Sequence, residues 1–89
     1  SKKKIYLAKG LKYFEQAKVG EFQCESHSLS VGDEIMITGP TTGYLEMKIE
    51  ELRVDGKPTD KVVKGNIFTI VSDEKIRPSD KLYKLVPEV

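Results

Sequence analysis

Cys24 and His27 lie close together in the sequence, and their side chains are of the types that form nucleophilic or metal-binding sites. A metal site needs about four ligands, or three and a water, and the chain contains no further Cys or His. A cysteine nucleophile needs a histidine base within reach and a third group that orients it. Cys24 stands at an apolar position of an alternating segment, where cysteine behaves as a small hydrophobic residue. We therefore predict a buried structural cysteine and a loop histidine.

Other residue patterns also lack the features that catalysis requires. No serine lies in a Gly-x-Ser-x-Gly sequence, the usual setting of a serine nucleophile on a sharp turn. Neighbouring carboxylates such as Glu50 and Glu51 point to opposite faces of a strand, so they make poor acid–base pairs. The segment 39–43, Gly-Pro-Thr-Thr-Gly, lacks the Gly-Lys-Ser/Thr ending of a phosphate-binding loop. The sequence predicts no catalytic residue, no metal and no cofactor.

Basic residues are scattered along the chain, but Lys48, Arg53, Lys57, Lys61 and Lys64 suggest a surface for a partner. On a barrel they would lie along one hairpin and its neighbour, beside a tyrosine able to stack on a base. The alternative is ordinary protection of exposed strand edges, for which lysine is well suited. The candidate contacts to RNA or to another partner are Tyr44, Lys48, Arg53, Lys57 and Lys61.

Length and composition indicate one small folded domain. The chain has 89 residues and 38% hydrophobic residues, as a folded domain does. Its net charge of +1 excludes a protein that binds polyanions through bulk charge. A single cysteine forms no internal disulfide and favours a reducing, cytoplasmic setting. No apolar run approaches the ~18 residues of a membrane span, so we expect no membrane partner. We expect Ser1–Lys4 to be flexible and a single domain to run from 5 to 89, in a piece of a longer protein.

The elements that would position any site are short strands separated by turns. The segment 31–43 contains a turn at Val31–Asp33, a strand at Glu34–Thr38 and a second turn at Gly39–Gly43. Pro40 ends the strand because it has no amide hydrogen to donate. Further strands are expected at 5–14, 62–63, 67–71 and 81–86.

Two segments change the phase of their hydrophobic pattern. In 17–25, Ala17 and Val19 alternate with polar residues, and then Phe22 and Cys24 alternate in the opposite phase. A β-bulge near Gly20–Glu21 would keep all four side chains on one face. Gly10 is expected to mark a bulge or a close approach of another backbone.

The segment 44–54 shows the same change of phase. We predict one strand with a bulge near Glu50–Glu51, whereas a helix is the alternative because glutamate and leucine are good helix formers. Asp55-Gly56 predicts a tight hairpin turn. The residues expected to form or support turns are Gly20, Gly32, Asp33, Gly39, Pro40, Gly43, Gly56 and Gly65.

Short strands at regular spacing predict an all-β fold, a small antiparallel barrel of about six or seven strands. The segment 29–40, Leu-Ser-Val-Gly-Asp-Glu-Ile-Met-Ile-Thr-Gly-Pro, resembles the second domain of translation GTPases such as elongation factor Tu. The segments 63–66 and 76–82 resemble later parts of that domain, and 10–14 fits its opening strand. The same order of motifs resembles, more closely, the small C-terminal barrel of collagenase-like U32 peptidases, over about 5–86.

This resemblance implies a C-terminal accessory barrel without catalytic residues. Its partner would be an upstream catalytic domain of the parent protein, possessing the peptidase (hydrolase) activity, and its role would be to bind substrate or to pack against that domain. The translation-factor resemblance implies a second class of function, an RNA-binding module in translation or RNA modification. A third reading is a structural domain that stabilises an oligomer. An exposed tyrosine on a basic face would favour RNA, and an exposed apolar patch would favour packing.

Overall fold

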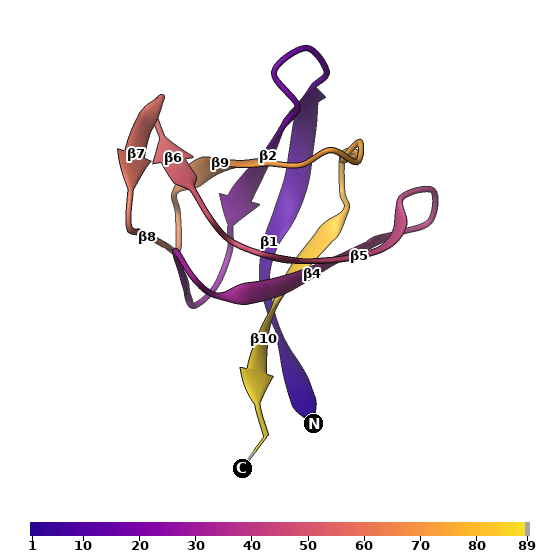
Figure 1. Ribbon diagram of the computed structural model, residues 1–89, viewed down its shortest axis with the longest axis vertical. Helices are drawn as coiled ribbons and strands as arrows, with labels where there is room; N and C mark the ends of the chain where they lie inside the picture. Colours follow the sequence, from indigo (N-terminus) through magenta and orange to yellow (C-terminus); the bar gives the residue numbers. More distant parts are fainter. Residues whose placement is uncertain (89) are drawn as a thin grey trace.

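The computed structural model describes residues 1–88 and consists of antiparallel strands (Figure 1); Val89, the end of the predicted domain, lies outside the described residues. An eight-stranded sheet has the order β5-β4-β10-β1-β2-β9-β6-β7, and β3 pairs separately with β8. The strands are β1 (Lys2–Phe14), β2 (Val19–Cys24), β3 (Ser28–Ser30), β4 (Glu34–Gly39), β5 (Gly43–Lys48), β6 (Leu52–Val54), β7 (Lys57–Thr59), β8 (Lys61–Val63), β9 (Ile67–Val71) and β10 (Lys81–Pro87).

The long strand β1 holds the sheet together because it pairs with two different strands. Its first part pairs with β10 and its second part with β2, and both ladders contain a register shift, at Tyr6/Ala8 and at Gly10/Lys12. Such bulges bend a strand and increase its twist, so the sheet curls around its inner face. One continuous apolar core fills the curl, with Phe22 and Phe68 stacked at a centroid distance of 5.7 Å.

The predicted all-β antiparallel fold is confirmed, but the number of strands is not. Residues 1–88 form ten strands rather than six or seven, because several expected strands and loops divide into short paired segments. The residues directly after the predicted loop histidine His27, for example, form β3. Lys2–Lys4, expected to be flexible, belong to β1 and pair with Leu85–Pro87.

The bulge predicted at Gly20–Glu21 lies on the neighbouring strand instead. Gly20 sits inside the regular strand β2, where it lies on the same buried face as Phe22 and Cys24. No phase change is needed because Ala17 lies in the turn before β2 and is exposed. Gly20 is required for another reason: a Cβ there would come within 2.8 Å of the Ile76 side chain. The prediction for Gly10 is confirmed, since both a register shift and a close approach to the Arg77 carbonyl occur there.

The segment 44–54 is neither one bulged strand nor a helix. It is divided into β5, which pairs with β4, and β6, which pairs with β7 and β9. The intervening residues 49–51 connect β5, at one edge of the sheet, with β6, which lies next to the strand at the other edge. Ile49 and Leu52 are both buried, so the change of phase that predicted a bulge reflects a change of strand.

The predicted turns that join adjacent strands are confirmed. Asp55 and Gly56 both have positive φ, 54° and 75°, which is the geometry of a two-residue hairpin loop. Gly32 (φ 97°) precedes Asp33, whose carboxylate accepts a hydrogen bond from the Ser30 amide at 2.8 Å. Turns also occur at Pro40–Thr42, between the paired Gly39 and Gly43, and at Lys64–Gly65, where Gly65 has a φ of 97°.

No helix within residues 1–88 has the length and apolar character needed to cross a membrane.

Candidate functional site

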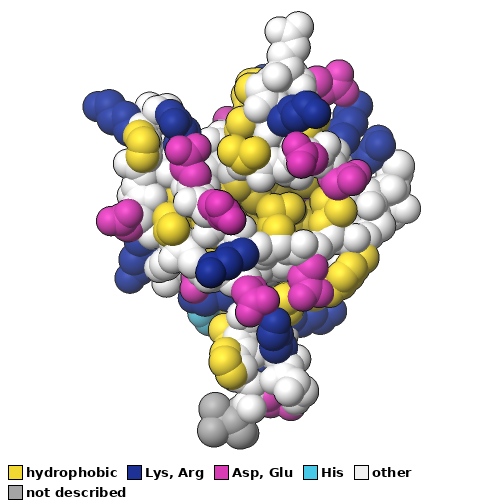
Figure 2. Space-filling model, in the orientation of Figure 1, with side chains coloured by type: hydrophobic (Ala, Val, Ile, Leu, Met, Phe, Trp, Pro, Cys, Tyr) yellow, Lys and Arg dark blue, Asp and Glu magenta, His cyan; other side chains and the backbone are white. Residues whose placement is uncertain are grey.

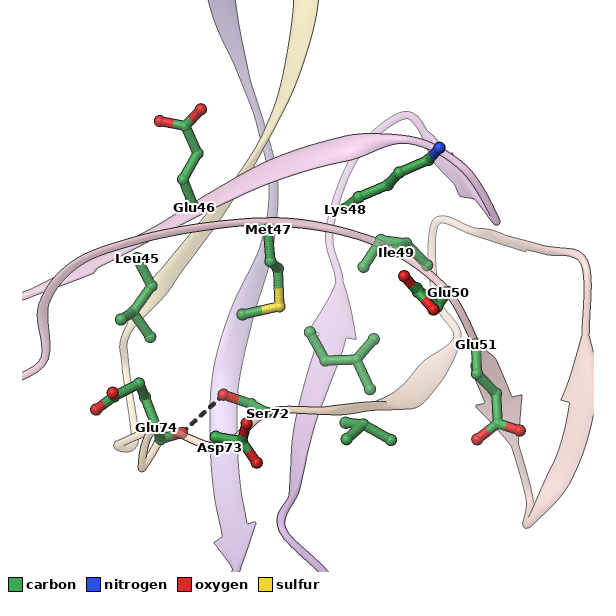
Figure 3. Close-up of a pocket in the computed structure, with 12 residues that line it drawn as sticks. Leu45, Glu46, Met47, Lys48, Ile49, Glu50, Glu51, Ser72, Asp73 and Glu74 are labelled. Carbon is green, nitrogen blue, oxygen red and sulfur yellow. Dashed lines mark hydrogen bonds between the residues drawn. The ribbon is translucent and has the colours of Figure 1, made fainter.

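A cleft of about 550 Å³ opens between β5 and the end of β9. Its apolar lining comes from Leu45, Met47 and Ile49 on one side and from Ile70 on the other. Figure 3 shows Leu45 and Met47 pointing from β5 across the cleft, toward the backbone around Ser72. Both side chains are half-buried and pack against the main core, so the cleft is an incompletely covered part of that core. Its volume lies in the range of about 300–1,000 Å³ that is usual for ligand sites.

The rim of the cleft is strongly acidic. Five carboxylates and one ammonium group line it: Glu46, Glu50, Glu51, Asp73, Glu74 and Lys48. In the space-filling view, acidic side chains surround a hollow in which hydrophobic atoms are exposed (Figure 2). The site therefore combines an apolar floor with a negative border, which suits a ligand that is apolar on one side and positively charged on the other.

Two of these carboxylates have partners on the protein. Glu51 accepts a hydrogen bond from the Arg53 guanidinium at 3.1 Å, which lowers the pKa of Glu51. The Tyr44 hydroxyl donates a hydrogen bond to Glu46, which raises the pKa of Tyr44. The remaining three, Glu50, Asp73 and Glu74, form no ion pair within residues 1–88. Their negative charge is therefore available to a partner.

The five predicted contact residues lie on four different strands. Tyr44 and Lys48 lie on β5, beside the cleft, and Tyr44 is 58% exposed. Arg53 and Lys57 lie on the β6–β7 hairpin, and Lys61 begins β8. Tyr44 and Lys48 thus lie on the strand that borders the cleft. Arg53, Lys57 and Lys61 lie on strands that follow the connecting segment 49–51. The sequence did not reveal that acidic groups outnumber basic groups at this edge, since that follows only when 45–51 and 70–74 come together.

Cys24 and His27 occupy the positions expected for them. Cys24 is 1% exposed, its Sγ lies 3.4 Å from the Ser26 carbonyl oxygen, and burial raises the pKa of its thiol. His27 is exposed in a bend with a positive φ of 57°. In the part of the chain that the structure describes, no three His, Cys, Asp or Glu side chains are grouped so as to hold a metal ion.

Asp80 is the buried ionisable residue that the sequence analysis missed. It is 1% exposed and accepts hydrogen bonds from the Thr42 hydroxyl at 2.5 Å and from the Arg77 amide at 2.9 Å. A Cβ on Gly39 would come within 2.8 Å of its Cγ, so the carboxylate fits only over a glycine. These contacts fasten the 72–80 loop to the β4–β5 turn, and they use the carboxylate for structure.

The fold and the cleft together define a class, a small and partly open antiparallel β-barrel. Its open seam, the gap between β5 and the end of β9, is lined by core side chains and bordered by carboxylates. No family model matches the chain. Two solved structures of the C-terminal domain of a Geobacillus thermoleovorans protein assigned to the U32 peptidases share its fold. Each superimposes with a TM-score of 0.82 at 18% identity; the selenomethionine form matches over 88% of this chain and 96% of its own.

Curated relatives add similarity in sequence. The chain is 50% identical over 84 residues, 94% of its length, to a collagenase of Porphyromonas gingivalis, and 26% identical over 83 residues to an uncharacterized protease of Methanocaldococcus jannaschii. It spans about one fifth of the length of these proteins, 20% of each. The chain is thus similar in sequence to part of a collagenase and shares the fold of the C-terminal domain of a U32 peptidase, the resemblance that its motifs had suggested.

Proposed function

We propose that this barrel is a non-catalytic accessory domain of a collagenase-like peptidase, and that it binds the polypeptide substrate for an upstream catalytic domain. The observation that carries the proposal is the match to collagenases: 50% identity along nearly the whole barrel, which spans only 20% of that protein. The barrel is thus a minor part of those proteins, and their other four fifths have room for the catalytic machinery. A cytoplasmic setting remains our expectation from the single cysteine.

The cleft is why substrate binding is the role proposed, in place of packing against the catalytic domain alone. Stable interfaces between proteins bury about 1,200–2,000 Å² and have a large apolar centre. Leu45, Met47 and Val71 line a cleft of about 550 Å³ with a charged border, whereas other exposed apolar side chains, Phe14, Val31, Val63 and Ile67, do not line it. A site of this kind suits a polypeptide that binds reversibly.

The proposal is tested on the parent protein with and without this domain. We expect removal of the domain to slow the hydrolysis of a long substrate such as gelatin by raising its KM, and to leave the hydrolysis of a short fluorogenic peptide unchanged. An accessory binding domain affects only substrates long enough to reach it. Equal loss on both substrates would indicate a packing role, and no loss on either would remove the proposal.

RNA binding is the second candidate function. It is favoured by Lys48, Lys57 and Lys61, which are exposed and form no ion pair within residues 1–88. It is disfavoured by the acidic rim beside Tyr44 and Lys48. Titration of the chain against tRNA at increasing salt tests it: binding that weakens steeply with salt, and that fades when Lys48, Arg53 and Lys57 are changed to Glu, would support RNA contact. Absence of binding at low salt in folded protein would dismiss it.

A further inference from the structure

The outer edge of β5 has backbone groups without a ladder partner in residues 1–88. Within the described part of the chain, β5 pairs with β4 alone. The Ile49 amide donates to the Asp33 carbonyl at 2.8 Å, and the Ile49 carbonyl accepts from the Gly32 amide at 2.8 Å, so the backbone of Ile49 faces β4. Backbone direction alternates along a strand. The amides and carbonyls of Tyr44, Glu46 and Lys48 therefore point away from β4, off the outer edge of β5.

The facing edge of β9 is free in the same manner near its end. The Ser72 amide donates to the Lys18 carbonyl at 2.9 Å, so Ser72 faces β2. By alternation, Thr69 and Val71 face away from β2. Thr69 meets Arg53 of β6, but the ladder between β6 and β9 contains this one pair only. Val71, which is 56% exposed, is left facing the seam.

We propose that an extended segment of the polypeptide substrate adds to the outer edge of β5 as an antiparallel strand and occupies the seam between β5 and β9. The inference rests on the proposed function and names its binding site. Addition of a strand satisfies the free backbone groups along the outer edge of β5, which supplies affinity without regard to sequence. Side chains of the bound segment alternate between the two faces and supply the selectivity.

The two sides of the bound segment face different surroundings, so they favour different side chains. Inward-pointing residues of the segment meet Leu45, Met47 and Ile70, so they should be apolar and of moderate size. Outward-pointing residues lie beside Glu46, which Figure 3 shows directed away from the cleft floor. A lysine or arginine opposite Glu46 forms a favourable cross-strand pair. The expected segment therefore alternates apolar and basic residues.

Charge also separates this occupant from a second copy of the chain. Two β5 edges paired antiparallel would bring the Glu46 and Glu50 carboxylates of one copy close to those of the other, and like charges across strands are destabilising. A basic peptide instead meets unpaired carboxylates at both ends of the cleft, from Glu50 on one side and from Asp73 and Glu74 on the other. Proline in the segment should weaken binding, because it removes a ladder donor.

The experiment measures binding of a fluorescent eight-residue peptide in which valine alternates with lysine, by anisotropy, to the 89-residue chain. We expect the peptide to bind, and the same peptide with glutamate in place of lysine to bind at least about tenfold more weakly. N-methylation of alternate peptide amides removes strand donors without any change to the protein, and the methylated form whose blocked amides face β5 should lose binding. This arm does not depend on the folding of a variant.

Charge reversal then locates the site. The double variant Glu46→Lys/Glu50→Lys should weaken the lysine peptide about tenfold, whereas Glu88→Lys is the matched control. Glu88 is exposed next to the C-terminal end of β10, which lies far from the β5–β9 opening in Figure 1. Thermal unfolding of each variant verifies that the fold is retained.

Each outcome decides the inference. Binding that needs the peptide amides and the two glutamates supports it. Binding that is indifferent to N-methylation, or that is lost equally in Glu88→Lys, overturns strand addition at this seam. Absence of peptide binding, or self-association of the chain through β5 in sedimentation, overturns it as well. The gelatin experiment is independent: a parent protein that needs the domain for gelatin, with no peptide bound at the seam, would keep the proposed function and reject the site.

Discussion

Strand β5 is fastened firmly at its first end and left open along its outer edge. At the β4–β5 turn, the buried Asp80 carboxylate binds Thr42 and sits directly over Gly39. Along the outer edge, Met47 is half-buried above an acidic cleft, and no strand of the described chain pairs there. The same strand thus takes part in a completed corner and an uncompleted seam.

The difference teaches where this fold keeps its stability. The Asp80 corner satisfies a buried charge with short hydrogen bonds and tolerates no added atom, so its geometry is fixed. The seam leaves backbone groups to hydrogen-bond with water and apolar atoms exposed, so it contributes less burial to stability than the closed core does. Changes at the corner should therefore cost much folding free energy, and changes at the seam should cost little folding free energy and more binding.

The largest effect is expected for Gly39→Ala. The new Cβ would lie within 2.8 Å of Asp80 Cγ, so this buried carboxylate would have to shift and strain its hydrogen bond from Thr42. We expect a loss of about 3–5 kcal/mol in the free energy of unfolding, measured with urea. Gly65→Ala is the matched control: nothing lies within 4 Å of its Cβ position, so only its φ of 97° opposes the change, at ~1–2 kcal/mol. Equal losses would show that the corner is not rigid.

The next comparison sets the closed core against the seam. Ile37 on β4 is fully buried, and truncation to alanine should cost about 3–4 kcal/mol in unfolding free energy. Met47 on β5 is half-buried, and the same truncation should cost about 1–2 kcal/mol. Peptide binding should show the reverse order, with Met47→Ala the more damaging. If Met47→Ala costs as much stability as Ile37→Ala, the seam is part of the closed core.

A smaller effect is expected for Tyr13→Phe. The Tyr13 hydroxyl donates to the Ser72 carbonyl at 2.7 Å and ties the end of β9, one wall of the seam, to β1. Loss of this hydrogen bond should lower the unfolding free energy by about 1 kcal/mol. Tyr44→Phe removes only an exposed contact to Glu46 and should change stability by less than about 0.5 kcal/mol. Urea unfolding of the two variants checks the contrast.

The sequence predicted the closed parts of the molecule better than the open one. Local signals sufficed for the Asp55-Gly56 turn and for the Glu34–Gly39 strand, because turn chemistry and alternation are properties of neighbouring residues. The bulge at Gly20 was wrong because the pattern was read across the exposed turn residue Ala17. The division of 44–54 was missed because β5 and β6 follow one another without a turn signal.

The candidate site was predictable only in part, for a related reason. Tyr44 and Lys48 were singled out from the residues of one strand. The cleft arises from two segments, 45–51 and 70–74, that are separated in the chain by the β6, β7 and β8 strands and meet without hydrogen-bonded pairing. Asp80 was missed because its burial depends on a glycine on a different strand, and no spacing in the sequence links Asp80 with Gly39.

The last prediction compares two tyrosines, one on the closed side and one at the open edge. Burial, followed by a hydrogen bond to Glu25, raises the pKa of Tyr6 to about 12, whereas Tyr44 at the seam has its pKa raised chiefly by the hydrogen bond to Glu46. A pKa that is higher in the folded than in the unfolded state means that the stabilisation is complete below about pH 10 and is lost as the pH rises toward 12.

We therefore expect the unfolding free energy to fall more steeply between pH 10 and 12 in the wild type than in Tyr6→Phe. The ultraviolet absorbance of ionised tyrosine, followed as the pH is raised, should lack its highest-pH step in that variant. Tyr44→Phe should change this high-pH limb less, because its phenol is exposed and solvent competes with Glu46 for the hydrogen bond. Should Tyr44→Phe flatten the limb as much as Tyr6→Phe, the open edge would be as desolvated in solution as the closed side. The outer edge of β5 would then already be covered in solution and would not be open to an added strand.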